Sequence, residues 1–410
     1  MRKINPHNFQ IATRGTSREI NRRIALNLVH THQPISRADL ARLMGLRRGA
    51  VSLLVNDLLA ESAIFEGSTG ESHRGRKPTF LYIETRQRCA VAVDIRVSGT
   101  HLRVTDLMGR QLVATSTFAT ERDPKRFVAD LAKRIKKVLA DHKAVGACEG
   151  VGVVVPGMVD RATSRIIHAP TLGWRDVEIR QPLAAATGLR IHVENSGKAC
   201  ALAQMWEARG DTAAGGDLVF VSVSDGIGVG VVVNGEILRG HHNIAGEFGH
   251  VPLSIDGPRC SCGATGCWEA YISNLATLSR YFGRDLREAK PVAAEVATFT
   301  PVFTVADLIV RARAGDAKAV AAVQATARYL GLGLASIVNA VDPARIYIGG
   351  EIIAAWDLIE SAVRTALAER ALSPDAAKTE IRTVSLEDHP RLRGAVALVS
   401  APAFAAPAVA

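Results

Sequence analysis

Four residues between positions 250 and 267 have the types and spacing of a metal site. They form the pattern His250-x9-Cys260-x-Cys262-x4-Cys267, and imidazole and thiolate groups are the ligands that structural zinc takes in fours. The alternative is three buried thiols beside an unrelated histidine, which the close spacing of the cysteines disfavours. Because four protein ligands leave no open position for an activated water, we expect a structural zinc that holds the loop 250–267 in place.

Two carboxylates adjoin this zinc loop. Glu247 lies three residues before His250, and Glu269 lies two residues after Cys267. Carboxylates fixed by a metal-held loop beside Asn195 are suitable acceptors for the hydroxyl groups of a sugar. Each glutamate alone could be a surface residue, so this prediction depends on the fold bringing the three side chains together.

A second group of residues has the chemistry of DNA binding. Apolar periodicity predicts helices over 21–32, 36–44 and 47–62, with Ser36 as an N-cap and Gly45 as the turn between the last two. This is a helix-turn-helix, whose last helix enters the major groove. Ser52 and Asn56 would lie on its exposed face. The arginines expected to contact bases or phosphates are Arg37, Arg42, Arg47 and Arg48.

The stretch AIFEGSTGESHRGRKPTFLYI predicts a two-stranded wing after these helices. Its tip carries Arg74, Arg76 and Lys77, which suit a narrow A·T-rich minor groove. Residues 1–90 hold 15 Lys and Arg against 7 Asp and Glu, whereas the rest of the chain holds 35 against 33. The alternative is a three-helix bundle with a solvated basic face, but this charge asymmetry favours DNA binding.

The elements that position these residues form more than one unit, since 410 residues exceed a single ordinary core. From about residue 88, strands alternate with helices in two sets, which indicates an α/β body of two lobes. A helix over 394–404 would return to close the first lobe. We expect an N-terminal arm over 1–17, a winged helix-turn-helix over 18–85, a first lobe over 86–196 plus 390–410, and a second lobe over 197–389.

Composition excludes several classes of protein. Six cysteines are too few for a secreted disulfide framework, and Cys89, Cys148 and Cys200 are expected to be core thiols. The sequence indicates neither a signal peptide nor a membrane span, so we expect a cytoplasmic protein without membrane insertion. Trp174 could line the sugar cleft or pack in the core.

Over about residues 18–402 the chain resembles the ROK (repressor, open reading frame, kinase) family, specifically the branch that contains the xylose, N-acetylglucosamine and making-large-colonies repressors. The most specific motifs are GVGVVVPGMVD at 150–160, AGEFGH at 245–250, the zinc segment at 249–269 and VDPARIYIGGEI at 341–352. The resemblance implies an actin-like (ribonuclease H-like), ATPase-type sugar-binding body, and a homodimer or tetramer. It also implies that Asn195, Glu247, His250 and Glu269 contact the sugar, with His250 shared between sugar and zinc.

Three departures from the kinases of this family imply that kinase activity is lost. The phosphate turn Asp-x-Gly-Gly-Thr is Asp94-Ile95-Arg96-Val97-Ser98 here, and Gly-Thr-Gly-Ile-Gly is Ser224-Asp225-Gly226-Ile227-Gly228. Side chains and a carboxylate therefore occupy the places where backbone groups would cradle phosphate. The catalytic Asp of Glu-Asn-Asp-Ala-Asn is Ser196, which cannot serve as a general base near neutral pH.

These observations predict a transcriptional regulator, most simply a repressor, that binds operator DNA and responds to a carbohydrate held between the lobes. The change at Ser196 leaves a modified, phosphorylated or non-sugar effector open. Two alternatives remain: an ATP-dependent sugar kinase that retains a DNA-binding extension, and a repressor controlled by a protein partner.

Overall fold

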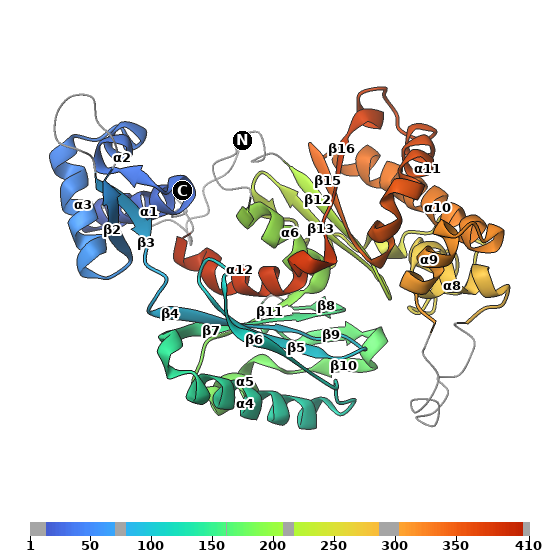
Figure 1. Ribbon diagram of the computed structural model, residues 1–410, viewed down its shortest axis with the longest axis horizontal. Helices are drawn as coiled ribbons and strands as arrows, with labels where there is room; N and C mark the ends of the chain where they lie inside the picture. The colour runs from blue at the N-terminus through green and yellow to red at the C-terminus, as the bar shows by residue number, and fades with distance from the viewer. Residues whose placement is uncertain (1–13, 70–78, 161, 208–216, 287–302, 405–410) are drawn as a thin grey trace.

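The computed structural model describes residues 14–69, 79–160, 162–207, 217–286 and 303–404. An N-terminal helical domain precedes a two-lobed α/β body whose lobes each contain a five-stranded sheet (Figure 1). The expected α/β fold class, with a helix-turn-helix before an actin-like body, is confirmed.

The N-terminal domain consists of α1 (Arg14–His32), α2 (Arg37–Met44), α3 (Arg48–Ala60) and the three-stranded sheet β1-β3-β2 (β1, Ile35–Ser36; β3, Thr79–Ile83; β2, Ile64–Thr69). The side chain of Ser36 accepts a hydrogen bond from the Asp39 amide and caps α2, as predicted. Gly45 ends α2 in the left-handed conformation, at φ 64°, which turns the chain into α3.

The first helix begins at Arg14, seven residues before the predicted start and within the expected arm 1–17. Residues 14–20 lack apolar periodicity, so the sequence pattern did not predict this first part of α1. Ion pairs stabilise it instead: Arg18 binds Asp57 of α3 at 2.7 Å, and Glu19 pairs with Arg22 at 2.8 Å. The remainder of the expected arm, residues 1–13, lies outside the described residues.

The two sheets have the same strand order and directions, which is a consequence of two equivalent α/β halves. The first sheet has the order β11-β7-β4-β5-β6, and the second has the order β16-β15-β12-β13-β14. In each, a central strand pairs in parallel on one side and antiparallel on the other. Their bounds are β4 (Arg88–Asp94), β5 (Thr100–Asp106), β6 (Gln111–Phe118), β7 (Ala147–Val155), β11 (Ile191–Asn195), β12 (Leu218–Val223), β13 (Ile227–Val233), β14 (Glu236–Ile237), β15 (Arg345–Gly350) and β16 (Glu380–Thr383).

Helices α6 (Ser196–Glu207) and α12 (Pro390–Phe404) lie between the two sheets (Figure 1). Helix α12 packs on β4 and β7 of the first lobe, α6 packs on β12 and β13 of the second, and the two helices contact each other. The closing helix was predicted from residue 394, but it begins at Pro390, because proline is well suited to the first turn of a helix.

The remaining elements cover the outer faces. In the first lobe these are α4 (Pro124–Asp141), α5 (Arg180–Thr187) and a small sheet of β8 (Met158–Val159), β9 (Ile166–Ala169) and β10 (Trp174–Val177). In the second lobe they are α7 (Glu269–Ile272), α8 (Asn274–Phe282), α9 (Val305–Arg313), α10 (Ala317–Val341) and α11 (Trp356–Ala368). Helix α10 is long and apolar enough to cross a membrane, but 56% of its most apolar window is buried and it forms the core of the second lobe.

Candidate functional site

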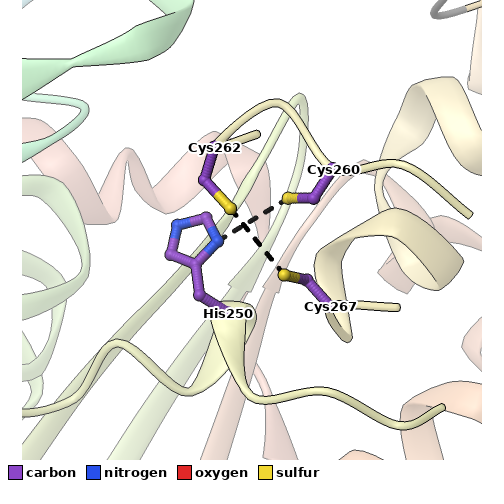
Figure 2. Close-up of side chains that lie close together, drawn as sticks. All are labelled: His250, Cys260, Cys262 and Cys267. Carbon is purple, nitrogen blue, oxygen red and sulfur yellow. Dashed lines mark hydrogen bonds between the residues drawn. The ribbon is translucent and has the colours of Figure 1, made fainter. Parts of the chain in front are cut away.

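The four candidate metal ligands converge on one point (Figure 2). Their ligand atoms lie within 4.8 Å of one another, with the sulfurs of Cys262 and Cys267 3.8 Å apart and Cys260 Sγ 3.7 Å from His250 Nδ1. A tetrahedral centre with zinc–sulfur bonds of ~2.3 Å separates its sulfur ligands by ~3.8 Å. The donor set and its geometry therefore fit zinc.

The second ring nitrogen of His250 faces a carboxylate. Nε2 lies 4.0 Å from Glu247 Oε2, while Nδ1 faces the cysteines. This separation is longer than a hydrogen bond, so Glu247 is a neighbour of the ring and not a hydrogen-bond partner. Both His250 and Glu247 line the adjoining cleft.

This cleft lies between the lobes and contains all four predicted effector-binding residues. The lining residues from the first lobe and the interlobe helices include Arg96, Val97, Ser98, Pro156, Gly157, Asn195, Ser196 and Arg391, and those from the second lobe include Asp225, Gly226, Glu247, His250, Ser261, Glu269 and Glu351. Asn195, Glu247, His250 and Glu269 come from separate segments, so only the fold brings them together.

Two of these residues are fixed by hydrogen bonds that leave acceptor capacity free. Asn195, at the end of β11, donates from Nδ2 to the Gly157 carbonyl at 2.8 Å, and its Oδ1 accepts from the Lys198 amide at 3.1 Å. Glu269, at the start of α7, accepts from the Ile227 amide at 2.9 Å and from Ser261 Oγ at 2.8 Å. Because a carboxylate has about four lone-pair sites, Glu269 can still accept from a ligand hydroxyl.

Glu247 is half-buried beside other charged groups. Burial raises the pKa of Glu247, the nearby His250 and Lys198 oppose this effect, and Glu269 adds to it. Burial also lowers the pKa of Lys198, whose ammonium group donates to the Asn243 carbonyl at 2.5 Å. Hydrogen bonds made in such a low-dielectric environment are stronger than those in water.

The turn after β4 carries an arginine that lines the cleft. Arg96 Nε lies 2.6 Å from one oxygen of the fully buried Asp94, and Arg391 Nε lies 2.8 Å from the other. Arg391 also donates to the Ile95 carbonyl at 3.1 Å. Two guanidinium groups therefore share one buried carboxylate at this end of the cleft. Arg96 donates a hydrogen bond to it, whereas Arg391 contacts it as an ion pair without hydrogen-bond geometry.

Arg391 and Glu351 were not found from the sequence. Arg391 lies 297 positions from Asp94 and before the predicted start of the closing helix. Glu351 accepts a hydrogen bond from Asn274 at 3.1 Å and lines the cleft near Asp225. The motif VDPARIYIGGEI contains Glu351 but gave no indication of its role.

On the candidate DNA-binding surface, Arg47 precedes α3 and Arg48 begins it, and both are exposed. Asn56 is exposed one turn beyond the half-buried Ser52. Arg37, which is expected to contact phosphate, binds Glu66 at 2.9 Å and donates to Asn56 Oδ1 at 3.0 Å. Its charge is therefore partly neutralised within the domain.

Leu53 was missed by sequence reasoning. It is 62% exposed on α3, next to Ser52, where an amphipathic helix would be expected to be polar. An exposed apolar side chain on a recognition helix can contact a thymine methyl group. The predicted wing residues Arg74, Arg76 and Lys77 lie outside the described residues.

Trp174 lies in the core of the first lobe rather than in the cleft. Trp174 is 2% exposed, packs against Phe127 and donates to the Arg122 carbonyl at 2.9 Å. The three remaining cysteines behave as core thiols: Cys89 and Cys200 are buried and Cys148 is half-buried.

The two equivalent α/β lobes, with a Cys3His cluster in the wall of the cleft between them, define a sugar-kinase-like body. The helix-turn-helix that precedes this body is a domain of the DNA-binding type. Residues 90–401 match the ROK family, and the chain belongs to that family.

Relatives that match about nine tenths of the chain include a repressor and a transcriptional regulator, whereas a glucokinase matches a smaller share. The xylose repressor of Bacillus subtilis (strain 168) is 28% identical, with 89% of this chain and 91% of the repressor covered. The glucokinase of Halalkalibacterium halodurans is 32% identical over 61% of this chain and 76% of the kinase. A crystal structure of a ROK family transcriptional regulator, a homolog of the E. coli MLC protein, has a TM-score of 0.78 at 24% identity and covers 95% of this chain and 97% of its own, which shows the shared fold.

Proposed function

We propose that this chain is a transcriptional repressor whose affinity for operator DNA is controlled by a small carbohydrate bound between the lobes. The observation that carries the proposal is the convergence of Asn195, Glu247, His250 and Glu269 on one interlobe cleft in a chain with a helix-turn-helix. Similarity to a xylose repressor over 89% of the chain supports the same function.

DNA binding would use the exposed side of α3. Arg48, Ser52 and Asn56 are proposed to read base edges, Leu53 a thymine methyl group, and Arg47 a phosphate. The wing residues Arg74, Arg76 and Lys77 would enter the minor groove, as expected from their sequence. A homodimer or tetramer would place two such helices on half-sites about one helical turn apart.

The charges in the cleft favour a neutral carbohydrate over a phosphorylated one. Four carboxylates line it, at Asp225, Glu247, Glu269 and Glu351, whereas its two arginines already share Asp94. A phosphate would meet more negative than positive side chains. D-xylose is the first candidate, because it is the sugar named for the similar repressors.

Phosphoryl transfer is not part of the proposed function. The side chains of Arg96 and Val97 line the cleft where a phosphate cradle requires bare backbone, and Asp225 adds a like charge. Ser196 lines the cleft where a kinase requires a general base, whose loss costs about 10²–10⁴-fold in rate.

Zinc would stabilise the loop 250–267, which forms part of the cleft wall. Bound by His250, Cys260, Cys262 and Cys267, it would have a full set of four protein ligands and a structural role. We place the regulator in the cytoplasm, where it would meet both DNA and sugar.

Fluorescence anisotropy of the zinc-loaded protein on DNA from its own upstream region tests the proposal, with sugars, amino sugars and sugar phosphates added at fixed salt. We expect sequence-specific binding that D-xylose weakens by about tenfold, within the range usual for allosteric coupling. Absence of specific binding would refute the repressor. Specific binding that no compound changes would favour control by a protein partner.

A further inference from the structure

Two helices begin at the effector cleft and end on the first helix of the DNA-binding domain. Helix α6 follows directly on Asn195, and its first residue, Ser196, lines the cleft. Helix α12 contributes Arg391 to the cleft from its first turn. Their other ends, at Trp206 and Phe404, meet beside α1.

The contact with α1 is an aromatic cluster around a buried histidine. The ring of His30 stacks on Phe404 with centroids 4.6 Å apart, and its centroid lies 4.3 Å from that of Trp206. One turn earlier, Asn27 donates from Nδ2 to the Phe404 carbonyl at 2.8 Å. We define His30, Trp206, Phe404 and Asn27 as the junction.

The two helices are held together closely enough to move as a unit. At Gly394, a Cβ atom would lie 2.2 Å from the Ala199 carbonyl oxygen, so the backbones of α12 and α6 are in direct contact. Arg393, the residue before Gly394, forms an ion pair with Glu207 at the end of α6. Packed elements of this kind shift between discrete arrangements rather than deform continuously.

One apolar core also runs through the junction. Ala25 and Val29 of α1, Val396 and Val399 of α12 and Ala92 of β4 belong to the same buried cluster. A shift of α12 over the first sheet would therefore disturb the packing of α1, and any repacking of α1 would be resisted by α12.

Each helix is anchored at the cleft by a polar contact that a ligand could alter. Asn195 accepts from the Lys198 amide in the first turn of α6, and Arg391 in the first turn of α12 pairs with Asp94. A ligand that changes either contact changes the position of a helix whose far end touches α1.

We propose that the junction couples the cleft to the DNA-binding domain, so that ligand binding is transmitted along α6 and α12 to α1. This inference rests on the proposed function and adds the path of regulation. Coupling requires that the ligand bind one arrangement of the helices more tightly than the other.

The test compares Trp206→Ala with wild type as the full, zinc-loaded chain, with D-xylose as the probe. Calorimetry measures sugar affinity and anisotropy measures DNA affinity. We expect both separate affinities to stay within about threefold of wild type, while the sugar-induced change in DNA affinity falls from about tenfold to less than about twofold. Retention of the full change would overturn the proposal.

Trp356→Ala is the matched control, because it removes a half-buried tryptophan from α11 of the second lobe, away from the junction. It should retain the wild-type response, and loss of the response in this variant would show a general packing effect and count against the junction. If Trp206→Ala does not fold, His30→Leu keeps an apolar side chain of similar size and should reduce the response in the same way.

A second measurement needs no sugar and separates this inference from the proposed effector. Arg391→Lys perturbs the cleft end of α12, and its effect on DNA affinity is measured alone and combined with Trp206→Ala. We expect Trp206→Ala to abolish or strongly reduce the effect of Arg391→Lys on DNA affinity. If the fold-changes in DNA affinity of the two single variants multiply in the double variant, the cleft end of α12 and the junction act independently. This conclusion holds whether or not D-xylose is the effector.

Discussion

At the scale of single residues, the cleft and the metal centre share His250. One ring nitrogen faces the cysteine cluster and the other faces Glu247, which lines the cleft. We therefore expect loss of the metal to disturb the proposed sugar site as well as the loop, because His250 belongs to the candidate metal cluster and also lines the cleft.

Cys262→Ser should abolish stoichiometric zinc binding, since serine is a poor substitute for a thiolate ligand. Zinc per chain is measured by mass spectrometry, and the free energy of unfolding by urea denaturation. Cys148→Ser is the control, because Cys148 is half-buried and lies outside the metal cluster. A Cys262→Ser protein with one zinc per chain would remove Cys262 from the ligand set.

Glu269→Gln should weaken sugar binding by about 10–100-fold, which corresponds to ~1.5–3 kcal/mol for a hydrogen bond to a charged group. The amide keeps the size of the side chain but replaces one acceptor oxygen with a donor. Calorimetry with D-xylose measures the effect, with Glu236→Gln on the exposed β14 as control. An unchanged affinity for D-xylose would place the sugar elsewhere. The affinity of the variant for DNA without sugar should remain that of the wild type.

At the scale of elements, α3 combines a buried apolar face with an exposed face that carries Arg48, Leu53 and Asn56. Val51, Leu54, Val55 and Leu58 fix its orientation in the domain. Arg37 of α2 contacts Glu66 of β2 and Asn56 of α3, so this arginine positions the recognition helix within the domain.

Arg48→Ala should weaken specific DNA binding by ~1–3 kcal/mol and relax the preference at one base pair, as expected for a guanine contact. Anisotropy on an operator series and on random DNA separates the two effects. Arg126→Ala, an exposed arginine on α4, controls for loss of charge. Equal weakening on all sequences would instead make Arg48 a phosphate contact.

At the scale of the whole molecule, the two lobes keep the architecture of a sugar kinase while the interlobe cleft holds an internal ion cluster. Arg96 and Arg391 line the cleft and both pair with the buried Asp94. This ion cluster supports the proposal that the body binds a sugar without transferring phosphate.

Magnesium-ATP should neither stabilise the protein nor be consumed by it. Thermal unfolding should show no rise in Tm at millimolar nucleotide, whereas a ligand at about 100 times its Kd adds ~2.7 kcal/mol. ADP release in the presence of D-xylose and D-glucose provides the activity measurement. Turnover that Arg96→Ala or Ser196→Ala abolished would establish a kinase and contradict the proposed function.

The sequence by itself determined features that depend on neighbours within about twenty residues. The spacing of His250, Cys260, Cys262 and Cys267 predicted their cluster, and Ser36 and Gly45 predicted the bounds of α2. Such features follow from local backbone geometry, which a short stretch of residues specifies.

The tertiary structure decided what long-range packing brings together. It paired Asp94 with Arg391, placed Trp174 in the core rather than the cleft, and joined His30 to Trp206 and Phe404. No local pattern specifies these partners, because each pair joins elements that are far apart in the sequence. The clustering of the candidate metal ligands could thus be predicted from their spacing, but the contacts on which the proposed coupling rests could not.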